Sequence, residues 1–439
     1  YAKGCYDSTN KRVFVTYYDG DNNTYYSVIG TLSGTTVTWG TAVQHSSSTG
    51  GSMPKSPPHY NATKDRFISC TSEGSSNSGK IRTWSASGTT LTLQHTRAFP
   101  RTGVELPVMI NVPGTARYGF FFKGQNNSNK LYGFVGELSS NGNSMDIGSD
   151  TVLDSNSCEA HHGCWVADKS FFFVPYTVWT HSGRMDARLV VDPGGTNTIS
   201  SSQGYEVNPH NQSNQRSNGA ICINGDQVLM NVYNTTNQSA FLAIWKPASQ
   251  TSMGTQGTNF TLPDKQEAGT LIHADLYDNT DGAMLYHVFQ YGNDSSNDYV
   301  RLNKFRIGAD NSITKINDAS DNSAENILES QGYNGFSVWH SDQKKLVSFT
   351  RDGDLHYQVN PRDASDIQDN GVAGFSSAGY SNGDTATINV VGNTVTQSGL
   401  TPGKEYFVTN SGGISQTASA LKSVKAGVAV TSTSLLIQT

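Results

Sequence analysis

The segment SCEAHHGC gathers side chains that could do chemistry within a few residues. It holds Cys158, Glu159, His161, His162 and Cys164. A structural zinc site normally uses a Cys-x2-Cys spacing and a second pair of ligands, and Cys-x5-Cys is a different pattern. We therefore expect no metal and no cofactor. The two cysteines are close enough to form a local disulfide in an oxidising compartment, and two free, buried thiols are the equal alternative.

Aromatic residues next to predicted loops could bind sugars. Trp165 and Trp179 lie close to turn-forming residues, as does Tyr25. A ring in such a place can stack on a sugar ring, whereas the alternative is a place in the core, which is commoner for Trp in a repeat. Together with His161 and His162, the two tryptophans are the candidate ligand-binding residues.

Glycoside hydrolysis is the enzymatic alternative, and it needs two carboxyl groups across a sugar, one of them with a raised pKa. The chain has nine glutamates, none of them in a recurring acidic motif. It also lacks the Ser-x-Asp-x-Gly-x-x-x-Trp box of sialidases. We therefore predict no catalytic residues and a protein that is not an enzyme.

The composition and the charge limit the classes of partner that this chain can bind. Charged residues are 15% of the chain, the net charge is −6, and no run is rich in Lys or Arg. Nucleic acid or an anionic membrane would need a concentrated basic face, so we expect no nucleic-acid partner. No apolar run approaches the ~20 residues of a membrane helix, so we expect no membrane insertion. Aromatic residues set among Gly, Asn and Ser favour strands and tight turns.

The elements that must position these candidates form a repeat. Residues 5–43 contain a short strand, a turn, an apolar strand, a polar tip, a third strand, a turn and a last strand, and this order recurs. One anchor in each second strand gives Phe14, Phe67, Phe121, Phe172, Leu229, Leu285 and Val347, at intervals of 51 to 62 residues. Four-stranded units of this size are the blades of β-propellers. We predict an all-β fold with a seven-bladed β-propeller over residues 1–368.

The repeat stops near residue 370. Residues 369–439 contain short β runs separated by Gly and Pro turns, and they match no repeat. A unit of this size is small for an independent core. We therefore predict a small C-terminal β domain that serves in assembly or docking.

Two patterns resemble a known family. One is Tyr-Asp-x3-Lys-Arg-Val-x-Val-x-Tyr-x-Asp from Tyr6, followed by Ile-Gly-Thr-Leu-Ser-Gly at 29–34. The other is Gly-Leu-Thr-Pro-Gly-Lys-Glu-Tyr-Phe-Val at 399–408, with Lys-Ala-Gly-Val-Ala at 425–429 and Leu-Leu-Ile at 435–437. They are similar to the propeller repeats and the C-terminal module of tail-fibre-like proteins of tailed bacteriophages.

This resemblance implies a virion structural protein, either a tail fibre or a surface appendage, that contacts the host surface through carbohydrate. Its expected partners are other virion proteins, further copies of itself and a host-surface glycan, and its expected location is the virion, outside the cell. The resemblance transfers no catalytic residue. The alternative, from another class, is a secreted or cell-surface lectin or glycoside hydrolase of propeller fold.

Overall fold

The structure is a computed structural model of the chain. It describes residues 2–207 apart from 34–35, 47–50, 53–55, 197 and 200–201, and residues 215–261 apart from 224, 235, 237–238 and 250–251. Beyond these it describes residues 268–275, 284–294, 297–307, 312–315, 325–328, 336–340, 345–351, 357–363, 375–376, 385, 387–408, 414–416 and 425–438.

The chain divides into two compact units. Unit 1 comprises Tyr1–Asp275, Tyr286–Phe305 and Asp310–Arg362. Unit 2 comprises Leu276–Leu285, Arg306–Ala309 and Asp363–Thr439. The boundary predicted from the sequence, between residues 368 and 369, stays a prediction.

Unit 1 is built from antiparallel sheets that follow one another along the chain. The first sheet holds β1 (Ala2–Asp7), β2 (Arg12–Asp19), β3 (Thr24–Ser33), β4 (Thr36–Trp39) and β5 (Val43–Gln44). The second holds β6 (Gly51–Ser52), β7 (His59–Asn61), β8 (Arg66–Glu73), β9 (Ser78–Ser87) and β10 (Thr90–Ala98). The third holds β11 (Val104–Asn111), β12 (Arg117–Gly124), β13 (Lys130–Leu138), β14 (Met145–Ile147) and β15 (Thr151–Asp154).

The later sheets repeat this plan. The fourth holds β16 (Cys158–Ala160), β17 (Cys164–Val166), β18 (Phe171–Val178), β19 (Arg184–Val191) and β20 (Ser202–Glu206). The fifth holds β21 (Gln215–Ile223), β22 (Gln227–Asn234), β23 (Ser239–Lys246) and β24 (Thr255–Thr261). The sixth holds β25 (Ala268–Asp275), β26 (Met284–Asp294), β27 (Asn297–Ile307), β28 (Ile313–Lys315) and β29 (Glu325–Leu328), and the last holds β30 (Phe336–His340), β31 (Lys345–Arg351) and β32 (Tyr357–Asp363).

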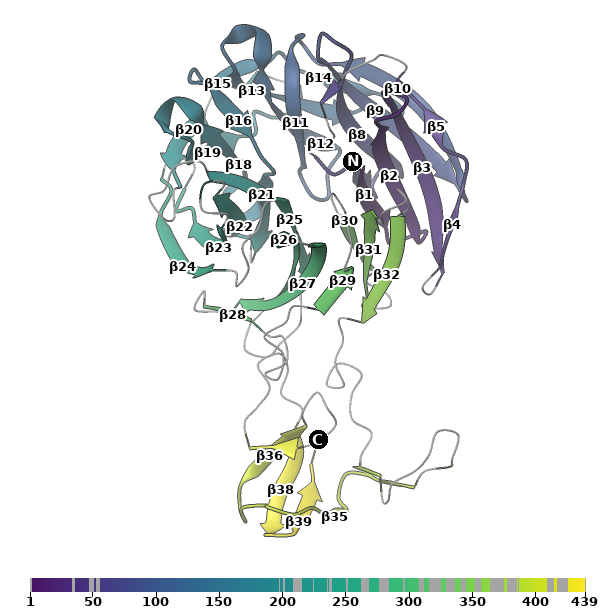
Figure 1. The fold of residues 1–439 in the computed structure, drawn as a ribbon, viewed down its shortest axis with the longest axis vertical. Helices are drawn as coiled ribbons and strands as arrows, with labels where there is room; N and C mark the ends of the chain where they lie inside the picture. Colours follow the sequence, from purple (N-terminus) through teal and green to yellow (C-terminus); the bar gives the residue numbers. More distant parts are fainter. Residues whose placement is uncertain are drawn as a thin grey trace. The chain divides into compact units, whose positions relative to one another are not determined.

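Each sheet of unit 1 packs against the next one. Strand β8 contacts β11, β12 contacts β16, and β18 contacts β21. Strand β21 then contacts β25, β25 contacts β30, and β30 contacts β1. Figure 1 shows these sheets arranged around a common centre, with β1, β25 and β30 toward the middle. The predicted all-β propeller fold is confirmed.

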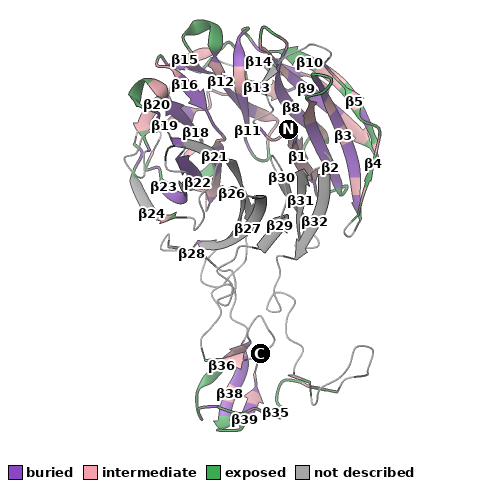
Figure 2. Cartoon of the chain, in the orientation of Figure 1, coloured by how far each residue is buried: buried purple, intermediate pink, exposed green. Residues whose placement is uncertain are grey.

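The core lies between the sheets, as the repeat predicts. The anchors Phe14, Phe67, Phe121, Phe172 and Leu229 are all fully buried, and they lie on β2, β8, β12, β18 and β22. Figure 2 shows the same pattern, with buried residues along the strands and exposed residues at the loops. Such strands are apolar at nearly every position because neighbouring sheets cover both of their faces. The side chains of the predicted anchors Leu285 and Val347 lie outside the described residues.

In each of the first three sheets, the strand that carries the buried anchor begins with an arginine, and this arginine contacts the next sheet. The Arg12 guanidinium donates to the Ala86 carbonyl (2.6 Å) and contacts Asp7. The Arg66 guanidinium donates to Asn143 Oδ1 (2.7 Å), and that of Arg117 pairs with an aspartate beyond β19. These guanidinium groups fix the register between neighbouring sheets.

Unit 2 contains a five-stranded sheet in the order β35-β39-β38-β36-β37. Its strands are β35 (Thr394–Thr396), β36 (Glu405–Val408), β37 (Ile414–Ser415), β38 (Lys425–Thr431) and β39 (Ser434–Ile437), and β33 (Phe375–Ser376) pairs with β34 (Ile388–Asn389). Leu435 and Ile437 are fully buried in its core. The role of this unit in assembly stays a prediction.

The helices of the described residues are three single 3₁₀ turns: η1 (Gln125–Asn127), η2 (Ala167–Lys169) and η3 (Trp179–His181). None of the described helices is long and apolar enough to cross a membrane.

Candidate functional site

Of the two alternatives for the cysteine pair of the fourth sheet, a local disulfide or two free, buried thiols, the structure has the free thiols. Cys158 on β16 and Cys164 on β17 are both free thiols. Cys158 lies opposite Val178 of β18, and Cys164 lies opposite Phe173 of the same strand. Five residues of an extended strand separate the two positions by about 16 Å, which is too far for a disulfide. Burial raises the pKa of both thiols well above the ordinary value, so neither is a reactive thiolate at neutral pH.

Gly163 allows β16 and β17 to pair with the same strand, β18. A Cβ atom at this position would lie 2.4 Å from the Phe173 carbonyl oxygen and 2.5 Å from Ile110 Cδ1. The connection between the two short strands therefore passes directly against β18, which only glycine permits.

His161 joins the fourth sheet to the fifth. Its Nε2 lies 2.6 Å from Thr177 Oγ1, and the Thr177 hydroxyl donates to the Gln215 carbonyl oxygen (2.6 Å). Because the single hydroxyl proton is used on that carbonyl, Nε2 of His161 must be the donor of the first bond. The side chain is 7% exposed. His162 follows it and is half-buried.

The aromatic candidates divide between core and surface. Trp165 is half-buried and packs edge-on against Phe172, with ring centroids 4.9 Å apart. Tyr25 is fully buried and donates its hydroxyl to the Ser72 carbonyl, so of the two alternatives for this ring the structure has the place in the core. Trp179 is half-buried at the end of β18, where its backbone N–H donates to the Ser157 carbonyl (2.9 Å).

At the edge between the third and fourth sheets lies a group of charged and polar side chains that we name the rim cluster. Trp179 directly follows Val178, which lies opposite Arg184 of this group. The rim cluster consists of Asp154, Tyr176, Arg184, Asp186, Arg188 and Glu206. Asp154 comes from the end of β15, and the others come from β18, β19 and β20. Tyr176 pairs with Asp186, and Asp186 pairs with Glu206, in the register of the fourth sheet, so these three project from the same face.

The inner part of the rim cluster holds Asp154 as an anion. The Arg188 guanidinium donates to its Oδ2 (2.9 Å), the Tyr176 hydroxyl donates to the same oxygen (2.8 Å), and the Asn156 backbone N–H donates to Oδ1 (2.9 Å). Burial by itself would raise the pKa of Asp154. The hydrogen bonds from Asn156, Arg188 and Tyr176 outweigh it, and the pKa lies below its ordinary value.

The outer part holds a second carboxyl group with the opposite shift. Arg184 binds Asp186 through two hydrogen bonds, of 2.7 and 2.9 Å, and reaches Glu206 at 3.2 Å. Burial raises the pKa of Asp186 more than the hydrogen bonds and the charge of Arg184 lower it, and the charges of Glu206 and Asp154 add smaller increases. The side chains of Glu206 and Arg184 are 48% and 30% exposed, so the cluster opens to solvent on this side.

Two carboxyl groups whose pKa values are pushed apart can act as proton donor and anion in one reaction. The guanidinium and carboxylate edges of the rim cluster are also suitable for hydrogen bonds to sugar hydroxyl groups. Sequence reasoning missed this site. One signal could have revealed it: Arg184, Asp186 and Arg188 alternate with apolar residues in β19, which places three charges on one face of a strand.

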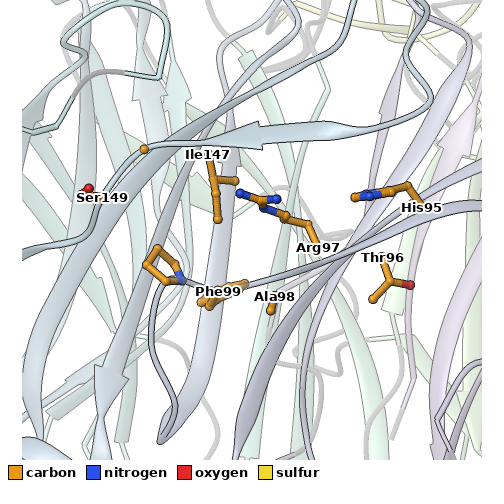
Figure 3. A pocket seen from close by; sticks show the side chains of 9 residues that line it. His95, Thr96, Arg97, Ala98, Phe99, Ile147 and Ser149 are labelled. Carbon is orange, nitrogen blue, oxygen red and sulfur yellow. The ribbon is translucent and has the colours of Figure 1, made fainter.

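A groove of about 480 Å³ lies at the outer edge between the second and third sheets (Figure 3). We name it the outer groove, and its lining residues are His95, Thr96, Arg97, Ala98, Phe99, Pro100, Ile147, Gly148 and Ser149. Arg97 extends toward Ile147 across the groove in Figure 3. Within the described part of the chain, no group of three or more His, Cys, Asp or Glu side chains is arranged to hold a metal ion.

No protein-family model and no curated protein sequence matches this chain. Solved structures do match. One is a protein from Lactobacillus plantarum, with 13% identity, a TM-score of 0.47, and coverage of 81% of this chain and 96% of that one. Another is a Trypanosoma rangeli sialidase (12%, 0.45, 83% and 65%), and a third is a polysaccharide lyase of family PL25, an ulvan lyase (8%, 0.48, 82% and 90%).

At these identities and TM-scores the similarity concerns the fold alone, and no activity is carried over from it. It does correct one prediction. The sequence reasoning excluded an enzyme, but two of these three structures are enzymes, so the fold gives no ground for that exclusion. Nothing in these matches indicates a phage tail fibre, and the resemblance to that family stays a prediction.

Proposed function

We propose that this chain is a carbohydrate-active propeller protein that binds a glycan at the rim cluster. The observation that carries the proposal is the pair of carboxyl groups, Asp154 and Asp186, with opposite pKa shifts beside an opening to solvent. In this reading Arg188 and Arg184 orient the two carboxyl groups, and the exposed oxygens of Glu206 accept hydrogen bonds from sugar hydroxyl groups. Trp179 supplies the aromatic surface at the same edge.

The opposite shifts also favour a second function, cleavage of the bound glycan. Asp186 keeps its proton to a higher pH than an ordinary aspartic acid, so it is the proton donor to the leaving oxygen. Asp154 stays ionised and is the anion that the reaction needs opposite this donor.

We further propose that the successive sheets of unit 1 are seven blades of one propeller, and that the C-terminal unit serves in assembly. The predicted virion role, the self-association and the extracellular location belong to the same set of proposals. A glycan site at a propeller edge is compatible with host-surface adhesion, because several copies would add avidity to a weak single contact. The mass in solution of the full chain, by light scattering, tests self-association.

The glycan proposal is tested on a glycan array with the full chain, followed by titration calorimetry with the best ligand. Arg188→Gln removes a charged hydrogen-bond donor and is expected to weaken binding about tenfold or more. Lys246→Gln is the control, because it likewise removes the cationic partner of an aspartate, Asp226 (3.0 Å), in the fifth sheet, away from the cluster. Absence of any glycan ligand, or equal weakening by both variants, would contradict the proposal.

Cleavage is tested separately by release of new sugar ends from the same ligand. Asp186→Asn is expected to abolish release while the glycan still binds, since the amide cannot donate the proton that the reaction requires. Full activity of this variant would remove Asp186 from the mechanism.

A further inference from the structure

We infer that the outer groove is a second binding site, one that takes an acidic sugar through Arg97 and His95. This site is separate from the rim cluster, so the two proposals succeed or fail independently. Its volume of about 480 Å³ falls in the usual range for small-ligand sites. Phe99, which is 5% exposed, forms part of its lining.

A β-bulge in the outermost strand of the second sheet turns the side chains of His95 and Arg97 toward the groove. The pairing of β10 with β9 shifts by one residue between Leu93 and His95. After the shift, His95 lies opposite Thr83 and Arg97 lies opposite Ile81. The extra residue of a bulge reverses the faces of all later side chains on that strand.

The side of the sheet to which the bulge turns these residues is the side of the third sheet. Thr83 donates its hydroxyl to the Asn143 carbonyl (2.6 Å), and Ile81 packs in one cluster with Phe120. Without the bulge, His95 would lie opposite Arg82, whose guanidinium reaches the other way, to the His45 carbonyl (2.8 Å). The groove therefore owes its basic wall to this one-residue shift in the register of β10.

Arg97 carries a positive charge without a carboxylate partner among the described residues, and its side chain is exposed. Two other arginines nearby are neutralised: Arg82 pairs with Glu73, and Arg101 pairs with Asp150. Nδ1 of His95 is buried and has no hydrogen-bond partner within the described chain. In a protein of net charge −6, an unneutralised guanidinium beside an unpartnered ring nitrogen is a suitable site for an anion.

The opposite wall fits a sugar rather than a bare ion. Ser149 is exposed and Gly148 is half-exposed, and both residues line the groove. A serine hydroxyl and backbone groups can exchange hydrogen bonds with sugar hydroxyl groups while the acidic group of the sugar binds Arg97. A carboxylate and a sulfate ester share this chemistry, and the experiment below separates them.

The test is titration calorimetry of the full chain with three probes: a galacturonate tetrasaccharide, a heparin tetrasaccharide and neutral maltotetraose. We expect binding of one or both acidic probes, weakening as salt is raised, with at least tenfold loss in Arg97→Gln and partial recovery in Arg97→Lys. Binding of the uronate alone identifies a carboxylate site, and preference for heparin identifies a sulfate site. Lys130→Gln, which removes one positive charge outside the groove, is expected to leave the affinity unchanged.

Ser149→Glu places a negative charge on the opposite wall at an exposed position and is expected to abolish binding of the acidic probes. Equal binding of maltotetraose, equal affinity of Arg97→Gln and the unchanged chain, or tighter binding of a tetraglutamate peptide than of either acidic sugar would overturn the inference. Unchanged thermal unfolding of the variants would show that such a result concerns the groove and not the fold.

Discussion

Arg82 of β9 and Arg188 of β19 are equivalent residues, each the fifth of its strand, and each reaches back to the end of the preceding sheet. The Arg82 guanidinium donates to the His45 carbonyl (2.8 Å), just after β5, and that of Arg188 donates to Asp154 (2.9 Å), at the end of β15. Arg82 and its partner Glu73 are closed off from solvent, at 3% and 6% exposed. The equivalent arginine therefore forms a buried ion pair with Glu73 in the second sheet and belongs to the partly exposed rim cluster in the fourth.

The buried ion pair between Arg82 and Glu73 makes the free energy of unfolding depend on pH. Burial by itself would raise the pKa of Glu73, but its interactions with His45 and Arg82 bring the pKa down to about 2. An unfolded glutamic acid titrates near 4.3, so this stabilisation is complete above about pH 5 and is lost as the pH falls toward 2. We expect a loss of about 3 kcal/mol in the free energy of unfolding over that range, measured by urea titration at several pH values.

Glu73→Gln tests the origin of that loss. At pH 7 this variant leaves the buried Arg82 charge uncompensated and is expected to be about 3–5 kcal/mol less stable. Its stability should then fall less steeply in acid than that of the unchanged chain. Glu137→Gln, at a partly exposed position in the third sheet, is the control and should retain the acid dependence. An identical slope in the two variants would assign the acid loss to other groups.

Arg12→Met tests how much Arg12, which connects the first sheet to the second, contributes to stability. It leaves the fully buried Asp7 carboxylate without its guanidinium partner, and we expect a loss of about 3–5 kcal/mol in the free energy of unfolding. Lys246→Met breaks an ion pair whose lysine side chain is 48% exposed and should cost less than about 1 kcal/mol. Equal small losses in both variants would mean that Asp7 finds another partner or a proton.

Gly163→Ala tests the close approach in the fourth sheet. The added methyl group would meet the Phe173 carbonyl oxygen at 2.4 Å, and overpacking of this kind costs about 1–3 kcal/mol. Gly20→Ala is the matched control, because no atom lies within 4 Å of a Cβ built there. Chemical denaturation of the two variants decides the matter, and equal midpoints would show that the segment before β17 can shift.

The cysteines offer a direct check of the chemistry inferred for the fourth sheet. The structure contains only free thiols, and burial raises the pKa of Cys70 to about 12. Alkylation after denaturation without a reductant is therefore expected to add a label to each of the five cysteines, whereas the native protein should react slowly. A mass two labels short would reveal a disulfide, and peptide mapping would show whether it joins Cys158 to Cys164.

The sequence reveals the propeller but not the rim cluster, and the difference has a physical cause. Anchors such as Phe14 and Phe172 repeat at a regular spacing because each sheet must bury its second strand in the same way. Asp154 of the third sheet and Arg188 of the fourth are 34 positions apart, and their contact depends on how one sheet packs against the next. No repeat period encodes that packing. The loop position alone made both Trp179 and Tyr25 candidates for sugar stacking, but Trp179 is half-buried whereas Tyr25 belongs to the core.

The bulge in β10 has a consequence for the evolution of such a protein. Strand β10 contributes only one buried residue, Leu91, so a mutation that shifts the register of its second half by one residue would leave the core contributed by this strand almost untouched. Yet it would transfer Arg97 from one inter-sheet edge to the other. An outermost strand is thus a place where one small genetic event can exchange whole sets of surface side chains, and with them the ligands a propeller recognises, at little risk to folding.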